Sequence, residues 1–260
     1  HLVRNYAAHL AHGLLGQTGF RLLNAPTFLP AYVMLLSGGS DIAVGLVLSL
    51  QAFGMLITPT IGANLIEHRT RVLPVGFATG GMMRLMVLFI ALSGLVLPES
   101  WALPAVALFV LGFGLFMGMQ GVIFNFLMSK VIPVSKRGRL TGLRNFLAGI
   151  TSAIVAWIGG EFLIGAEPTI AGYSWTFMMA FVLTTTGLAM LLFMREPEPP
   201  IVRTATPLGR RLKEIPALMR DDASFARYVF ARALATLGRM AAPFYILYAG
   251  GAIGLSGSTL

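Results

Sequence analysis

The sequence predicts an all-α polytopic membrane protein, and three observations carry that prediction. Of its 260 residues, 56% are hydrophobic and 11% are charged, whereas soluble domains carry about 25% charged residues. Its apolar segments reach the length of about 20 residues that a helix needs to cross a bilayer. They are too long and too uniformly apolar to be the roughly ten-residue alternating strands of a membrane barrel. Water-soluble and disordered classes are therefore excluded.

Seven apolar segments are expected to be transmembrane helices. They fall at residues 10–36, 42–65, 72–96, 102–129, 141–165, 173–194 and 224–250. Glycine and proline are frequent inside them, which membrane helices tolerate. The first six are predicted to form one bundle, residues 1–194, and the seventh to begin a second bundle, residues 224–260.

The segment between the two bundles, residues 195–223, is predicted to be a loop on the cytoplasmic side. Its opening run, from Arg195 to Pro200, contains prolines that end the sixth helix and extend the chain. Apolar residues then recur at spacings of three and four among basic ones, at Leu208, Leu212, Ile215 and Met219. This pattern fits an amphipathic helix on the inner leaflet. A solvated basic linker is the alternative, because Pro216 interrupts the pattern.

The connections between the segments alternate in charge. Residues 37–41, 98–100 and 165–172 contain no lysine or arginine. The opposite connections hold fifteen of the nineteen basic residues: Arg4, Arg69, Arg71, Lys130, Lys136, Arg137, Arg139, Arg144, Arg195, Arg203, Arg210, Arg211, Lys213, Arg220 and Arg227. Cytoplasmic loops carry such an excess. The net charge of +9 therefore indicates a cytoplasmic N-terminus in the plasma (inner) membrane, and no nucleic-acid partner is expected.

Several chemical classes lack the residues that they need. The absence of cysteine excludes disulfides, iron–sulfur clusters and thiol catalysis. No Gly-x-x-x-x-Gly-Lys-Ser/Thr loop is present, and segment 224–250 has no lysine for a retinal Schiff base. His9 and His12 could act as metal ligands, but the sequence offers no third ligand to complete a metal site with them. We expect no enzyme activity and no cofactor. The chain starts with His1 and shows no signal peptide, so we expect part of a longer protein.

A short internal repeat links the first and seventh segments. Pro30-Ala31-Tyr32-Val33-Met34 is followed by Gly38-Gly39, and Pro243-Phe244-Tyr245-Ile246-Leu247 is followed by Gly250-Gly251. Both copies lie near the outer end of a helix that starts inside. Six helices, a cytoplasmic linker and a repeat in the same orientation match the parallel-repeat plan of one large class of transporters.

With this plan, the sequence resembles the major facilitator superfamily. The family carries Gly-x-x-x-Asp-Arg-x-Gly-Arg-Arg between its second and third helices. The corresponding stretch here runs from Gly62 to Arg71, with Glu67 in place of the aspartate and Thr70 where glycine is usual. The stretch from Pro133 through Arg137-Gly138-Arg139 to Gly142 is close to the family's loop after helix four.

The resemblance implies a secondary active transporter that moves a small molecule by alternating access between two six-helix bundles. It also implies a gate of charged residues at the helix ends, formed by Glu67, Arg69, Arg71, Arg137 and Arg139. These groups could pair across the bundles and hold one face shut. The alternative is that the arginines only fix the topology. A transporter-like scaffold or assembly factor that moves nothing is the second functional reading.

Four arginines lie inside predicted spans, where a basic side chain costs about 2.5–3.5 kcal/mol: Arg21, Arg84, Arg232 and Arg239. Gln17, Arg21 and Asn24 share one helix face. Because helices one and seven line the cavity in the family, we expect an anionic or polar organic substrate there. The candidate substrate-binding residues are Gln17, Arg21, Asn24, Gln51, Gln120, Asn125, Asn145, Arg232 and Arg239. Arg84 is expected to be structural, because helix three is usually peripheral in this family.

The coupling ion, a proton or sodium, has one weak candidate. Proton-coupled transporters generally need a titratable carboxylate within the membrane, and Glu161 alone qualifies, toward the outer end of segment 141–165. The partners expected are therefore the lipid bilayer, a small-molecule substrate and a coupling ion, with the chain acting as a monomer.

Overall fold

A computed structural model describes residues 1–24, 28–197, 207–237 and 241–253, and these residues form helices joined by short connections, with no strand among them. The elements in order are α1 (Leu2–Asn24), α2 (Phe28–Leu36), α3 (Asp41–Ile57), α4 (Pro59–Glu67), α5 (Leu73–Val96), α6 (Glu99–Val131), α7 (Val134–Ile158), the π-helical turn η1 (Gly159–Ile164), α8 (Ile170–Ala189), the 3₁₀ turn η2 (Met190–Phe193), α9 (Leu208–Asp221), α10 (Ala223–Leu237) and α11 (Ala242–Ile253). The all-α class is confirmed.

Five of the described helical segments are long and apolar enough to cross a membrane. They are Asp41–Glu67, Leu73–Val96, Glu99–Val131, Val134–Ile164 and Ile170–Phe193, which correspond to the second to sixth predicted spans. The first predicted span appears as α1 and α2, and the seventh as α10 and α11. Residues 25–27 and 238–240, between the members of each pair, lie outside the described residues.

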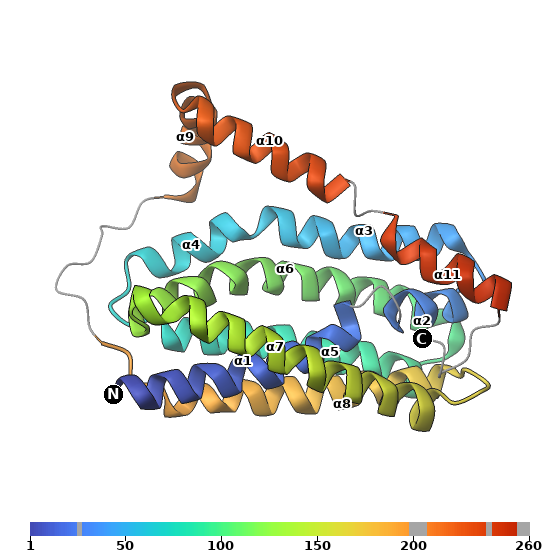
Figure 1. The fold of residues 1–260 in the computed structure, drawn as a ribbon. Helices are drawn as coiled ribbons and strands as arrows, with labels where there is room; N and C mark the ends of the chain where they lie inside the picture. Colours follow the sequence, from blue (N-terminus) through green and yellow to red (C-terminus); the bar gives the residue numbers. More distant parts are fainter. Residues whose placement is uncertain (25–27, 198–206, 238–240, 254–260) are drawn as a thin grey trace.

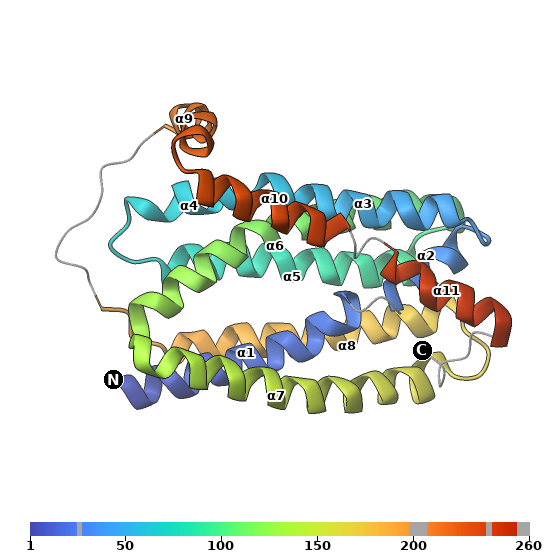
Figure 2. The same cartoon turned by 45° about the horizontal axis from the view of Figure 1, so that its top comes forward.

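The long helices run alongside one another in two sets (Figure 1). In one set α6 packs against α3 and α5, and in the other α1 packs against α7 and α8. Contact between α5 and α8 joins the sets, which Figure 2 shows as two layers. The pairing α6–α3 is thus matched by α1–α7, and α6–α5 by α1–α8. The fourth span thus packs against the second and third as the first span packs against the fifth and sixth. Two inverted repeats of three helices each produce this pattern.

The helix boundaries have local causes. Gly38 and Gly39 have φ values of 65° and 94°, a conformation that glycine adopts without strain. Ser40 then caps α3 by accepting a hydrogen bond from the Ala43 amide at 3.3 Å. Pro59 stands at the first position of α4, where its missing N–H costs nothing, and so divides the second span. These turns fix the ends of the helices that surround the site.

Glycines bring α3 and α4 into direct backbone contact with α6. A Cβ at Gly114 would lie 2.3 Å from the Gln51 carbonyl oxygen, and one at Gly54 would lie 2.6 Å from the Leu115 amide nitrogen. A Cβ at Gly118 would meet Thr58 Oγ1 at 2.3 Å. Only a residue without a side chain allows such an approach. The α3–α6 interface is therefore tight.

Several boundaries differ from the sequence prediction, among them the start of α1, which lies at Leu2 instead of residue 10. Helix α7 begins at Val134 instead of residue 141, so the basic stretch from Lys136 to Arg144 is helical and not a connection. Helix α9 continues through Pro216, so this proline does not end the amphipathic pattern. Its apolar residues Leu212 and Ile215 are exposed.

The two copies of the Pro-x-Tyr repeat occupy corresponding elements. Pro30 lies in α2 and Pro243 in α11, each the shorter, second helix of its predicted span. Helices α2 and α11 are also in contact.

Candidate functional site

Polar side chains link α1 to α7 at three successive levels. Gln17 donates to Asn145 Oδ1 at 3.3 Å, in the amide orientation that also lets it accept from Arg144 Nε at 3.1 Å. At the next residue of α1, the hydroxyls of Thr18 and Thr151 lie 2.6 Å apart. The helices are therefore joined through side chains and not by direct backbone contact.

Arg21 makes the third link. Its Nη1 donates to Ser152 Oγ at 3.0 Å and to the Ala148 carbonyl at 3.3 Å. The side chain is exposed, and both partners are neutral. The structure thus brings three of the predicted substrate-binding residues, Gln17, Arg21 and Asn145, into one polar interface. Asn24 closes α1, and its side chain lies outside the described residues.

A cavity of about 230 Å³ opens beside this interface, between α1, α5, α6 and α7. It is lined by His12, Gly13, Gly16, Gln17, Phe20, Met83, Arg84, Gln120, Phe124 and Arg144. These residues supply two guanidinium groups, two amides and an imidazole, with two aromatic rings as walls. No carboxylate is among them.

Arg84 is held firmly on one wall of this cavity. It is 2% exposed, and its Nε donates to the Thr184 carbonyl at 2.6 Å and its Nη1 to the Gly80 carbonyl at 2.7 Å. Its guanidinium carbon lies 5.2 Å from the centre of the Phe20 ring, a cation–π distance. These bonds fit the structural role expected for Arg84, but the residue also reaches the cavity.

Arg144, on α7, also lines the cavity and was not among the predicted site residues. Its guanidinium carbon lies 5.6 Å from the centre of the Phe124 ring. Its side chain crosses α1 at Gly13, where a Cβ would lie 2.1 Å from Arg144 Cδ. Arg144 was predicted to belong to a basic connection, and this prediction is wrong because Arg144 lies beyond the second turn of α7 and lines the cavity.

Two histidines of α1 lie next to the cavity. The His12 ring nitrogen Nδ1 is 2.9 Å from the Gly187 carbonyl oxygen. His9 is fully buried, and within the described part of the chain neither of its ring nitrogens has a hydrogen-bond partner. Its ring lies 4.5 Å from that of Phe124, between centroids. No group of three or more metal-ligating side chains occurs among the described residues.

The remaining predicted substrate-binding residues are not brought together. Gln120 lines the cavity, but its amide accepts from Thr79 Oγ1 at 2.7 Å and donates to the Gly76 carbonyl at 3.3 Å, which ties α6 to α5. Gln51 is half-buried on α3, Asn125 is exposed on α6 and Arg232 is exposed on α10, and none of the three lines the cavity. Arg239 lies outside the described residues.

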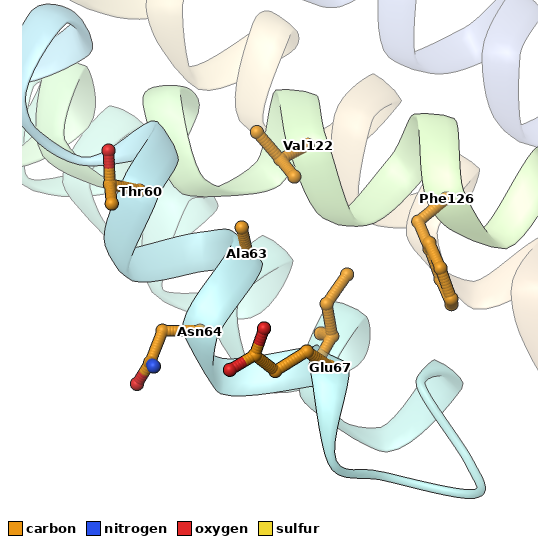
Figure 3. A pocket seen from close by; sticks show the side chains of 7 residues that line it. Thr60, Ala63, Asn64, Glu67, Val122 and Phe126 are labelled. Carbon is orange, nitrogen blue, oxygen red and sulfur yellow. The ribbon is translucent and has the colours of Figure 1, made fainter. Parts of the chain in front are cut away.

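The predicted gating residues lie at one end of the bundle. We call it the basic end, the end at which residues 68–72 and 132–133 connect the helices. Glu67, at the end of α4, lines a recess of about 320 Å³ with Thr60 and Asn64 of α4 and with Val122 and Phe126 of α6 (Figure 3). Arg69 and Arg71 follow in the connection, and both are exposed.

Arg137 has a local structural task at the basic end. Its Nε donates to the Ile132 carbonyl at 2.8 Å and its Nη2 to the Ser129 carbonyl at 2.6 Å. These carbonyls belong to the end of α6, where the last helical acceptors lack partners within the helix. Arg139, two residues on, is exposed.

Glu196 is a charged group at the basic end that the sequence analysis did not single out. Its carboxylate accepts from the amides of Val72 and Leu73 at 2.7 and 2.8 Å, and it pairs with Lys130 Nζ at 2.6 Å. The Glu196 and Lys130 side chains are 4% and 11% exposed. Glu196 thus satisfies the first amides of α5 and fastens the chain after α8 to the ends of α5 and α6.

Glu161, the coupling candidate, lies in η1 near the end opposite the basic end. Its side chain is exposed. The π-helical turn ends at Gly165, which has a φ of 73°. Glu161 does not line the cavity that holds Arg84 and Arg144.

These features define a polytopic helical membrane protein whose helices surround a cavity lined in part by polar and cationic side chains. A sequence profile of the Major Facilitator Superfamily matches residues 14–260, and the chain belongs to this family of membrane transporters. Its members are typically transporters of small molecules rather than enzymes. No curated protein matches the chain.

Proposed function

We propose that this protein is a secondary active transporter that moves a small anionic or polar organic solute by alternating access. Arg21 is the observation that carries the proposal. It lies on a predicted span, where a charge is costly, and its hydrogen-bond partners on α7 are neutral. The two bonds use two of the five guanidinium donors. A substrate that accepts hydrogen bonds can engage the others.

Alternating access also needs a contact that opens and closes, and we assign it to the basic end. Glu67 and Arg71 are its first pair, with Arg69, Arg137 and Arg139 as supporting cations. Their position at helix ends supports this role, because charged pairs there can be exchanged when the bundles rock. The bundle at residues 1–194, the cytoplasmic loop at 195–223 and the second bundle from residue 224 are the moving parts that we propose.

The orientation and the coupling are part of the same proposal. The excess of basic residues at one end supports a cytoplasmic N-terminus in the plasma (inner) membrane. A proton or sodium ion drives transport, and Glu161 is the carboxylate that we assign to the coupling. We propose that the monomer is the working unit, with Asn24, Gln51, Asn125, Arg232 and Arg239 as further substrate contacts.

The test of transport is flux into proteoliposomes. The protein is reconstituted, and uptake of radiolabelled organic anions and neutral polar solutes is compared with that of empty vesicles, with and without a proton or sodium gradient. Arg21→Gln should lower the rate of uptake at least tenfold, and Arg220→Gln, at an exposed site on α9, should not. If the folded protein transports none of these solutes, the transporter proposal fails and the alternative, a transporter-like scaffold or assembly factor without transport activity, takes its place.

The test of the gate uses accessibility. Because the chain has no cysteine, a single cysteine at exposed Lys136, which is not one of the gating residues, reports solvent access at the basic end. Glu67→Gln should change the rate at which this cysteine reacts with a water-soluble maleimide at least threefold, because the gate is weakened. Equal reaction rates together with equal transport kinetics would remove Glu67 from the gate.

A further inference from the structure

We propose that the cavity between α1, α5, α6 and α7 binds a small oxyanion, with Arg84 and Arg144 as its two cationic contacts. The inference rests on the proposed function only in taking the bound ligand to be the transported solute, whose chemical class it names. The site is a recess within the six-helix bundle, and Arg21 is not among its lining residues.

The charge of the cavity supports an anion. Two guanidinium groups line it, and none of the described lining residues is acidic. A buried cation without a counter-charge is costly, and charge-assisted hydrogen bonds to a carboxylate or phosphate are about twice as strong as neutral ones. An oxyanion between Arg84 and Arg144 would supply the missing counter-charge to both.

The two arginines are also held in place before a ligand arrives. Arg84 has its Nε and one Nη occupied by backbone carbonyls, which fixes the plane of the guanidinium and leaves its second Nη for a ligand. Arg144 is held by the Phe124 ring and by Gln17. Such fixed donors lose little freedom on binding.

The size of the cavity limits the ligand. At about 30 Å³ for each water in the liquid, 230 Å³ corresponds to about eight waters. Inorganic phosphate and short dicarboxylates fit this space. Phe20, Phe124 and Met83 give the cavity an apolar part, which favours a short carbon chain over an inorganic ion. We therefore assign the site to a short organic carboxylate.

Gly13 distinguishes a binding role of Arg144 from a structural one. The Arg144 side chain lies across Gly13, and a Cβ there would collide with Arg144 Cδ. Because the colliding atom belongs to a flexible side chain, Gly13→Ala would displace the guanidinium without removing its charge. At Gly142, two residues before Arg144, a Cβ has no heavy atom within 4 Å. Gly142→Ala is therefore the matched control.

The experiment measures binding by the purified full chain in detergent, using radiolabelled succinate and inorganic phosphate as probes and succinamide as the neutral competitor. We expect saturable succinate binding that succinamide does not displace, with weaker binding of phosphate. Arg144→Gln and Gly13→Ala should each weaken succinate binding at least tenfold, and Gly142→Ala should leave it within twofold.

The outcomes are separable. Tighter binding of phosphate than of succinate would overturn the assignment to an organic carboxylate. The oxyanion site itself would be disproved if the folded wild type bound neither anion, or if Gly13→Ala bound as tightly as the control. If Arg144→Gln does not fold, Gly13→Ala alone decides. Flux of a neutral solute without anion binding would leave the transporter proposal intact and remove this one, whereas anion binding without flux would do the reverse.

Discussion

The α3–α6 and α1–α7 interfaces occupy equivalent positions in the two three-helix sets, yet they are built differently. At α3–α6, glycines bring the backbones together, and the Gln51 carbonyl oxygen lies where a Cβ of residue 114 would be. At α1–α7, side chains form the contact, through Gln17, Thr18 and Arg21. The α3–α6 interface has no room for a side chain at Gly54 and Gly114, whereas side chains form the hydrogen bonds of the α1–α7 interface.

The difference shows where the bundle can change. Backbone contact between glycines has one arrangement, because any shift separates atoms that are already in van der Waals contact. Hydrogen bonds between hydroxyl, amide and guanidinium groups can be exchanged for bonds to water or solute at little cost. We infer that α3–α6 is the rigid part of the bundle and that α1–α7, with the neighbouring cavity, is the part that responds to a ligand.

The largest expected effect is in the rigid interface. Gly114→Ala places a methyl group against the Gln51 backbone, which cannot move without shifting α3, so we expect a loss of about 3 kcal/mol in the free energy of unfolding. Gly121→Ala, on the same helix with no heavy atom within 4 Å, should not destabilise the protein. Thermal unfolding in detergent measures both. Equal melting temperatures would show that α3–α6 tolerates expansion and would end the contrast between the two interfaces.

A smaller effect is expected where the two sets are fastened together at the basic end. Glu196→Gln keeps an acceptor for the α5 amides but leaves Lys130 without its counter-charge, so we expect a loss of about 2 kcal/mol. Glu214→Gln is the control, since its pair with Arg210 is exposed and 3.7 Å long and should contribute little. Chemical denaturation of the two variants measures the difference. A loss no larger than that of the control would show that the sets are held by helix packing alone.

The architecture could be predicted from the sequence because the bilayer dictates it. Each span must satisfy its own backbone hydrogen bonds, so length and apolarity suffice to locate a helix. Segments 42–65 and 72–96 accordingly match Asp41–Glu67 and Leu73–Val96 closely. Charge misled the prediction at the start of α7, and also at the start of α1, where Arg4 is helical. Lysine and arginine on the first turns of a helix look like a connection, although long side chains can reach the interface from there.

The charged residues of the cavity and of the basic end were less predictable. Arg144 could have been found, since Leu140, Arg144, Ala148 and Ser152 recur every four residues and the other three are buried, which places Arg144 on the inner face once α7 is known to start early. Arg84 was expected to be peripheral because its helix usually is. Glu196 had no local signal at all, because its partners Val72 and Leu73 lie 124 and 123 residues away in the chain.

The smallest expected effect is in the polar interface, and it tests whether the hydrogen bonds there are as exchangeable as we infer. Thr18→Val is nearly isosteric and removes the bond to Thr151, which should cost about 0.6 kcal/mol, the average for such bonds between membrane helices. Thr186→Val removes a hydroxyl that bonds only within its own helix, to Val182, and is the matched control. Unfolding of both variants by denaturant gives the difference. A loss above about 2 kcal/mol for Thr18→Val would mean that α1–α7 is as rigid as α3–α6, and the ligand-responsive part of the bundle would then have to be sought elsewhere.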